Sequence, residues 1–302
     1  MSKVLQVKGY TLTWTIPSSY EGKLMREFLI DQKLSKRTLT AVKFDGGSIT
    51  INGNEENVRY PLSEGDVLQV RFPEEKPSET LIAEETPLSV VYEDADVLVV
   101  DKPWGMKTIP TKEEPTGSLA NAILGYFTQK GISSTVHIVT RLDKDTSGLV
   151  LVAKHRHVHH LFSLQQKGRE IKRTYEAFAE GVMNEFGMIE EPIGRKSDSI
   201  IEREVREDGQ YALTHYRVKK QFSEFSHVEL KLATGRTHQI RVHLSFIGHP
   251  LAGDDLYGGS IELIGRQALH CKKLHFFHPI TKEWLELEAG MPCDMKMLLD
   301  RQ

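Results

Sequence analysis

The sequence predicts an α+β fold built from two units of unequal size. Apolar, strand-like runs dominate the 302 residues, and helical segments fall between them irregularly rather than in a repeating βαβ series. A stretch rich in Pro and Glu, residues 73–88, has the composition of an extended linker. We therefore expect a small N-terminal α+β domain over residues 1–72 and a larger domain over residues 89–302.

The N-terminal unit is predicted to contain two helices followed by two strands. Apolar residues at helical spacing predict a helix over residues 21–34. Ser35 is a candidate N-cap for a second helix that ends near residue 43. Alternating apolar residues predict a strand over residues 46–53 that ends in an Asn-Gly turn, and a further strand over residues 65–72.

This order of elements resembles the alpha-L RNA-binding domain of the ribosomal protein S4 type. The resemblance rests on the helix pair, on the Ile-Thr-Ile-Asn-Gly run that ends at Gly53, and on Gly65-Asp-Val67. It implies that residues 1–72 bind RNA. The basic content of the unit is modest, so a small packing module without an RNA role is the alternative.

The larger unit is predicted to alternate between buried strands and amphipathic helices. Apolar and alternating runs predict strands over residues 96–103, 149–153, 174–181, 216–222 and 228–232. Helices are expected over residues 118–129 and 154–168, and a further helix begins near residue 238.

One loop in this unit concentrates charge between two apolar runs. Residues 141–148 read Arg-Leu-Asp-Lys-Asp-Thr-Ser-Gly, and a buried strand resumes at Leu149. Folds often place chemistry in such loops, because a rigid scaffold holds them still. A surface hairpin with a local Arg–Asp ion pair fits the same pattern, since such pairs are common and weak.

Residues 141–148 resemble the active-site signature of the RluA family of RNA pseudouridine synthases, and three later segments match further family motifs in order. These segments are Arg173-Thr-Tyr175, residues 235–244 with 247–258, and Leu269-His270 with His278-Pro279. The resemblance covers roughly residues 90–290. One departure is Thr140, where the family often has His directly before the Arg-Leu-Asp.

The resemblance implies an isomerase that converts specific uridines of structured RNA to pseudouridine. It implies a pseudouridine synthase core with a mixed, mainly antiparallel sheet and a central cleft. The reaction breaks the C1′–N1 bond and joins C1′ to C5 without redox chemistry or phosphate energy, so we expect no cofactor and no metal. Large-subunit ribosomal RNA is the expected partner. Transfer RNA, or a non-catalytic role in RNA binding or ribosome assembly, is the alternative.

The resemblance also assigns residues to roles. Asp143 is the expected nucleophile or base, Tyr175 the residue stacked under the target base, and Arg241 the cationic partner of Asp143. Asp145 is the local rival of Asp143, because spacing alone does not choose between them. Contacts with the substrate are expected from Arg141, Arg173, Arg236, His238, Gln239 and Lys102.

Taken from the residues alone, these assignments have ordinary alternatives. Arg141 and Arg241 could be exposed surface cations, and Tyr175 a core residue with a tethered hydroxyl. His155, His157, His159 and His160 follow one another closely, and two of them at i,i+4 could bind a metal. No adjacent Glu or third ligand supports that reading, so a solvated or RNA-facing helix is expected instead.

Composition places the chain among soluble proteins. Charged residues make up 27% of the sequence, and no apolar run approaches the roughly 18–20 residues of a membrane helix. The two cysteines suggest reduced thiols, so we expect a cytoplasmic protein. We also expect a monomer. The net charge of −3 argues weakly against nucleic acid, but basic residues concentrate between His137 and Tyr175.

Overall fold

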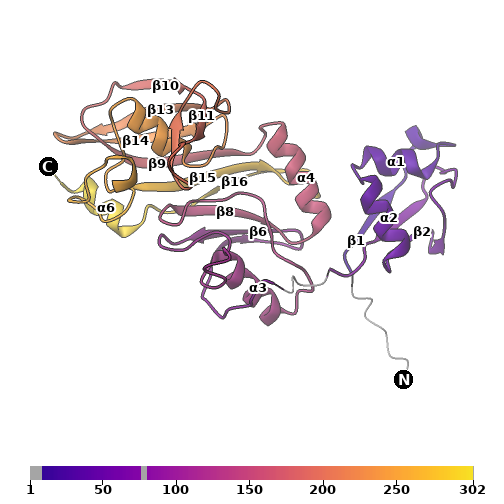
Figure 1. Ribbon diagram of the computed structural model, residues 1–302. Coiled ribbons are helices and arrows are strands. Elements are labelled where there is room, and N and C mark those ends of the chain that lie inside the picture. Colours follow the sequence, from indigo (N-terminus) through magenta and orange to yellow (C-terminus); the bar gives the residue numbers. More distant parts are fainter. Residues whose placement is uncertain (1–8, 76–79, 302) are drawn as a thin grey trace.

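The computed structural model describes residues 9–75 and 80–301 and confirms the α+β class (Figure 1). The N-terminal unit is an antiparallel four-stranded sheet of order β1-β4-β2-β3 with two helices. Its elements are β1 (Thr11–Thr15), α1 (Met25–Asp31), α2 (Lys36–Phe44), β2 (Ser48–Ile51), β3 (Asn54–Glu55) and β4 (Val67–Arg71). They enclose an apolar cluster of their own, to which Phe28, Leu29 and Leu68 belong.

Local chemistry explains most boundaries in this unit. Ser35 caps α2 as expected, since its hydroxyl accepts from the Thr38 N–H at 3.0 Å. The Asn-Gly turn is also present, with positive φ at Asn52 and Gly53. The first helix is shorter than expected, because residues before Met25 form turns and Lys33 adopts a left-handed backbone at φ 63°. Neither β1 nor β3 was predicted from the sequence.

The C-terminal unit is organised by one ten-stranded sheet of order β10-β13-β14-β9-β15-β8-β6-β5, with β16 paired to β15 and β7 to β8. The pair β8–β15 is parallel and the other pairs in the sheet are antiparallel, as the resemblance implied. Before the charged loop of residues 141–148, called the site loop below, lie β5 (Ser89–Glu93), β6 (Val97–Lys102), α3 (Leu119–Lys130) and β7 (His137–Ile138).

After the loop come β8 (Ser147–Ala153), α4 (Arg156–Lys167), β9 (Lys172–Glu180), β10 (Phe186–Glu190), β11 (Ile193–Arg195), β12 (Arg203–Val205), β13 (Leu213–Gln221) and β14 (Phe225–Leu232). The last elements are α5 (Gln239–Phe246), β15 (Leu269–Phe277), β16 (Trp284–Glu288) and α6 (Cys293–Leu299). In the described parts of the chain, no helix combines the length and apolarity needed to cross a membrane.

The segment between the units is not detached from the fold. The Glu84 N–H donates to the Asn121 carbonyl of α3, and the Glu84 carboxylate accepts from the Gly117 N–H. Glu75 accepts from the Arg156 N–H at the start of α4 and lies 2.6 Å from the His137 ring. Residues 80–88 contain no helix and no strand, yet both described parts of the segment contact the C-terminal unit.

Aromatic contacts join the two units at the start of α4. Tyr10 stacks on His155 with ring centroids 3.8 Å apart, and Phe72 stacks on His157 at 5.3 Å. Burial lowers the pKa of His157 to about 4, so its imidazole is neutral in this apolar contact. The expectation that these histidines lie on a solvated or RNA-facing helix is therefore wrong for His155 and His157.

A close approach at Gly148 joins the site loop to the sheet. Gly148 pairs with Cys271 where β8 and β15 run parallel, and its φ is 113°. A Cβ at this position would lie 2.3 Å from the Cys271 carbonyl oxygen, closer than real side chains come. Glycine is needed here because of both the backbone angle and the neighbour.

We predict that Gly148→Ala lowers the free energy of unfolding by about 1–3 kcal/mol, because the alanine must adopt a positive φ and displace β15. Urea denaturation would measure the change. Gly265→Ala is the matched control, since its Cβ would meet nothing within 4 Å. Equal effects of the two substitutions would contradict the close-approach argument.

Candidate active site

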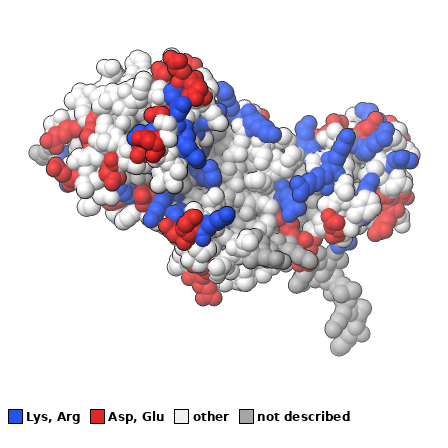
Figure 2. All heavy atoms as spheres, viewed as in Figure 1, with Lys and Arg blue, Asp and Glu red and all other residues white. Residues whose placement is uncertain are grey.

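A cleft of about 600 Å³ opens in the C-terminal unit beside the charged loop. Its walls come from residues 107–109 before α3, from the loop after β7, from α4 and β9, and from the turn that leads into α5. Eight of the nine site residues expected from the sequence line it: Arg141, Asp143, Arg173, Tyr175, Arg236, His238, Gln239 and Arg241. In Figure 2, Lys and Arg side chains gather on this unit near β11 and also on the N-terminal unit, on the same face of the molecule.

Hydrogen bonds from Thr108 and within the loop itself hold the Asp143 turn in place. The Thr108 hydroxyl donates to the Leu142 carbonyl at 2.7 Å and accepts from the Leu142 N–H at 3.1 Å. The Thr146 N–H donates to the Asp143 carbonyl at 3.2 Å, which closes the turn. The backbone on either side of Asp143 is therefore fixed before any substrate binds.

Lys102 is the ninth expected residue, and its assignment as a substrate contact is wrong. The side chain is fully buried, and its Nζ donates to the carbonyls of Pro103, Met106 and Lys144 at 2.7–3.0 Å. An ammonium has three hydrogens, so none remains for RNA. Lys102 instead ties the end of β6 to the Asp143 loop.

Arg241 is the buried cation of the cleft, but its main partner is not Asp143. Its Nε and Nη2 each lie 2.7 Å from an oxygen of Asp254, a carboxylate with almost no exposed surface. Its Nη1 lies 3.5 Å from Asp143 Oδ2, at the limit of a hydrogen bond. Arg241 therefore links a buried carboxylate behind it to the carboxylate that faces the cleft.

The environment of Arg241 keeps it charged. Burial alone would lower the pKa of Arg241, but the hydrogen bonds and charge of Asp254, with a contribution from Asp143, raise it above its usual value. The guanidinium also lies over the Tyr257 ring, 4.9 Å from its centroid. A permanent, fixed positive charge thus faces Asp143.

His238 approaches Asp143 from the N-terminus of α5, in a left-handed backbone conformation with φ 57°. The Tyr257 hydroxyl accepts from the Arg203 N–H, so its own hydrogen is free to bond His238 Nδ1 at 2.8 Å. The Nε2 of a neutral ring then carries the hydrogen, and it lies 3.9 Å from Asp143 Oδ2. Burial lowers the pKa of His238, which favours this neutral form.

Tyr175 lies in β9 with 4% of its surface exposed, yet its side chain reaches the cleft. Burial raises the pKa of Tyr175, so the phenol stays protonated. A neutral aromatic ring in the cleft wall can pack against a flat, neutral base. Arg173, in the same strand, lies so close to Gly235 that a Cβ atom on residue 235 would be 2.4 Å from Arg173 Nη2.

The geometry separates the two candidate carboxylates of the loop. Asp143 lines the cleft, whereas Asp145 does not, and the Asp145 carbonyl accepts from Arg266 Nη1 at 3.1 Å. Asp143 is therefore the carboxylate that a ligand in the cleft can contact.

Gln239 also differs from its expected role in substrate binding. Its Oε1 accepts from the Thr234 hydroxyl and the Arg236 N–H, and its Nε2 donates to Leu213 and Thr214. These four bonds use the full capacity of the amide, so Gln239 braces the turn before α5.

Sequence reasoning missed Asp254 and Tyr257 as members of the site. Both lie within residues 247–258, which were matched to a family motif without a role for either side chain. The available signal was the Asp254-Asp255 pair, which follows the apolar residues Leu251 and Ala252 after one glycine, since a carboxylate so close to an apolar run needs a cationic partner if it is buried.

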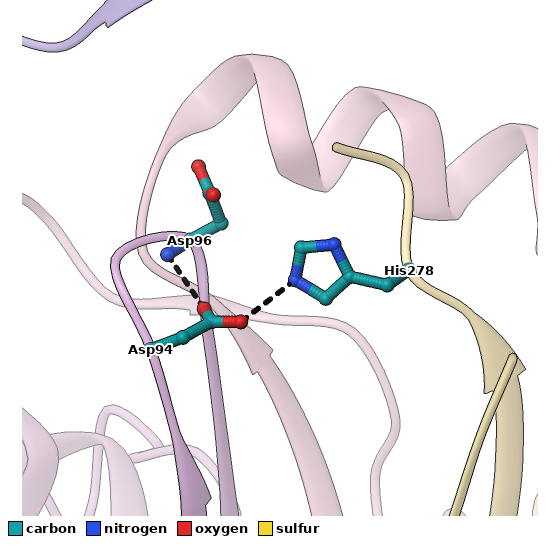
Figure 3. Close-up of side chains that lie close together, drawn as sticks. All are labelled: Asp94, Asp96 and His278. Atoms are coloured by element: carbon teal, nitrogen blue, oxygen red, sulfur yellow. Dashed lines mark hydrogen bonds and ion pairs between the residues drawn. The ribbon is translucent and has the colours of Figure 1, made fainter. Parts of the chain in front are cut away.

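Metal-ligand side chains also gather away from the cleft, at Asp94, Asp96 and His278 (Figure 3). His278 Nδ1 accepts from the N–H groups of Ile280 and Thr281. Its Nε2 therefore carries the hydrogen and faces Asp94 Oδ2 at 2.9 Å. A metal at Nε2 would have to displace that hydrogen, so this tautomer fits an Asp–His hydrogen bond better than a metal site.

Comparison with known proteins agrees with the motifs in the cleft. A family model described as RNA pseudouridylate synthase matches residues 96–246. The chain is 50% identical to the uncharacterized RNA pseudouridine synthase YjbO of Bacillus subtilis, over 91% of this chain and 98% of that protein. It is 38% identical to the ribosomal large subunit pseudouridine synthase D of Yersinia pestis, over 83% of this chain and 82% of the relative.

A solved structure shares the fold as well. Human RNA pseudouridylate synthase domain containing 1 superposes with a TM-score of 0.57 at 27% identity, over 69% of this chain and 85% of the human one.

We predict that Asp254→Asn lowers the free energy of unfolding by about 3–5 kcal/mol, because Arg241 loses its buried counter-charge. Any activity of the cleft should fall by roughly 100-fold or more, since the guanidinium is no longer aimed at Asp143. Asp255→Asn is the control, because the neighbouring carboxylate is exposed. Thermal unfolding of both variants measures the difference, and equal stabilities would contradict the role given to Asp254.

Proposed function

The chain belongs to the RNA pseudouridylate synthase family, and from this premise we propose that it converts specific uridines of large-subunit ribosomal RNA to pseudouridine. Family membership makes it an isomerase that acts on RNA. The finer choice of RNA is supported by relatives named ribosomal large subunit pseudouridine synthase D, which are 36–38% identical over most of their length. The observation that carries the proposal is that Asp143, Tyr175 and Arg241 line one cleft.

In the proposed reaction, Asp143 acts beside the ribose of the target uridine. The C1′–N1 bond breaks and a C1′–C5 bond forms, C5 loses a proton and N1 gains one, so the atoms balance without a co-reactant. An ionised carboxylate can attack the sugar or take up a proton. The fixed charge of Arg241 lies 3.5 Å from Asp143 Oδ2 and attracts this negative charge.

Tyr175 and Arg141 would position the nucleotide. Tyr175 offers a buried, neutral ring for the uracil to stack on while it is detached and turned. Arg141 is exposed at the rim of the cleft, where it can occupy the space that an extruded nucleotide leaves in a stacked RNA. His238, with its Nε2 hydrogen facing Asp143, can donate to a ribose or uracil oxygen.

The N-terminal unit is proposed to bind the same RNA. Its basic side chains face the viewer in Figure 2 together with those near the cleft, so one RNA can contact both. Lys36 and Arg37 are exposed at the start of α2. We further propose that the protein works as a cytoplasmic monomer, since one chain supplies every residue of the cleft described here.

Pseudouridine mapping across total RNA, with and without this protein, tests the proposed function. Asp143→Asn should abolish the modification while RNA binding survives, because an amide keeps the shape but cannot attack or take a proton. Asp145→Asn is the matched control and should cost much less. Activity of Asp143→Asn within about tenfold of the parent would reject the assignment. Modified sites in transfer RNA alone would reject the ribosomal target but keep the chemistry.

The role of the N-terminal unit is tested by replacing Lys36 and Arg37 with Gln. Point variants are preferable to deletion, which would uncover His155 and His157. We expect RNA affinity to fall about three- to tenfold and its salt dependence to weaken, with the turnover of bound RNA unchanged. The control replaces Lys219 and Lys231, whose charges are paired with Glu229. Equal losses in both pairs would contradict an RNA-binding surface on α2.

A further inference from the structure

A second cleft adjoins the first and shares one wall with it. It encloses about 470 Å³ between the β11–β12 hairpin and the turn before α5. Gly235, Arg236 and Thr237 line both clefts. A polynucleotide that leaves the first cleft across this turn therefore enters the second.

Three arginines give the second cleft its charge: Arg195, Arg203 and Arg236. Arg203 Nη1 donates to the carbonyls of Ile201 and Glu202. Arg236 donates to the Tyr211 carbonyl and to Gln210 Oε1. These acceptors are uncharged, so both guanidiniums are fixed in position while their positive charge is not neutralised.

The remaining donors of these side chains are available. Among the described residues, no hydrogen-bond or ion-pair partner is found for the Arg195 side chain, for Nε and Nη2 of Arg203, or for Nη2 of Arg236. The one carboxylate in the lining, Asp208, is paired with Arg206 through two hydrogen bonds. A preorganised cluster of cationic donors without competing carboxylates suits a phosphate group.

We propose that the second cleft is a subsite for the RNA strand next to the target uridine, in which Arg195, Arg203 and Arg236 hold the phosphate of an adjoining nucleotide. The proposal rests on the proposed function, because it assumes that a uridine occupies the first cleft. It assigns the β11–β12 hairpin to positioning the strand while Asp143 faces the ribose. Contacts of this kind fix the register of a nucleic acid without reading its bases.

Binding of the uridine pentanucleotide to the full-length protein tests the subsite, with fluorescence anisotropy measured at increasing KCl. Arg195→Gln should weaken binding about fivefold at low salt and reduce the salt slope by about 0.7, the value for one phosphate contact on a single strand. The affinity for uridine 5′-monophosphate should not change. Arg217→Gln is the control, since Arg217 is exposed on β13 and lines neither cleft.

A neutral methylphosphonate placed at each linkage in turn identifies the phosphate that is held. At one linkage, this change should weaken binding to the parent protein and have little further effect on Arg195→Gln, because the two changes remove the same interaction. Additive losses at every linkage, equal losses in Arg217→Gln, or no binding of the pentanucleotide by the parent protein would overturn the subsite. The binding assay needs no turnover, so a failure of the subsite is separate from a failure of the ribosomal target in the mapping experiment.

Discussion

The site depends on one buried guanidinium, that of Arg241. It lies between two carboxylates with different tasks: Asp254, which is buried and holds it at two points, and Asp143, which faces the cleft. A charge removed from water is stable only with a partner, and Asp254 provides that partner inside the protein. Arg241 can then present its third nitrogen to Asp143 without depending on that residue for its own stability.

The same arrangement explains why the surrounding loops are so strongly tethered. Asp143 must keep its distance from Arg241, and no strand or helix contains it. Lys102 and Thr108 bind the loop backbone from one side, and the β8–β15 pairing at Gly148 fixes where the loop returns to the sheet. On the other side, Gln239 braces the turn that leads to Arg241. The mobile part of the site is thereby reduced to exposed side chains such as Arg141.

Much of this could be predicted from the sequence, and the failures have a physical pattern. Eight of the nine site residues predicted from the sequence line the cleft, because chemistry concentrates in short segments with distinctive composition. Lys102 and Gln239 were misassigned because sequence shows which donors a side chain has but not which are already used. Asp254 was missed because its partner lies 13 positions away on another element. The contacts of His155 and His157 with Tyr10 and Phe72 join separate units, and no local pattern encodes them.

The turnover of a charge-balanced variant tests the central claim most directly. Replacing Arg241 with Gln and Asp254 with Asn together removes the guanidinium without leaving a buried carboxylate unpaired. The rate of pseudouridine formation and the affinity for RNA would be measured in the parent and in the double variant. If the fixed charge of Arg241 prepares Asp143 for the reaction, the rate falls by roughly 100-fold or more while the RNA affinity changes little. A rate within about tenfold of the parent would contradict the account.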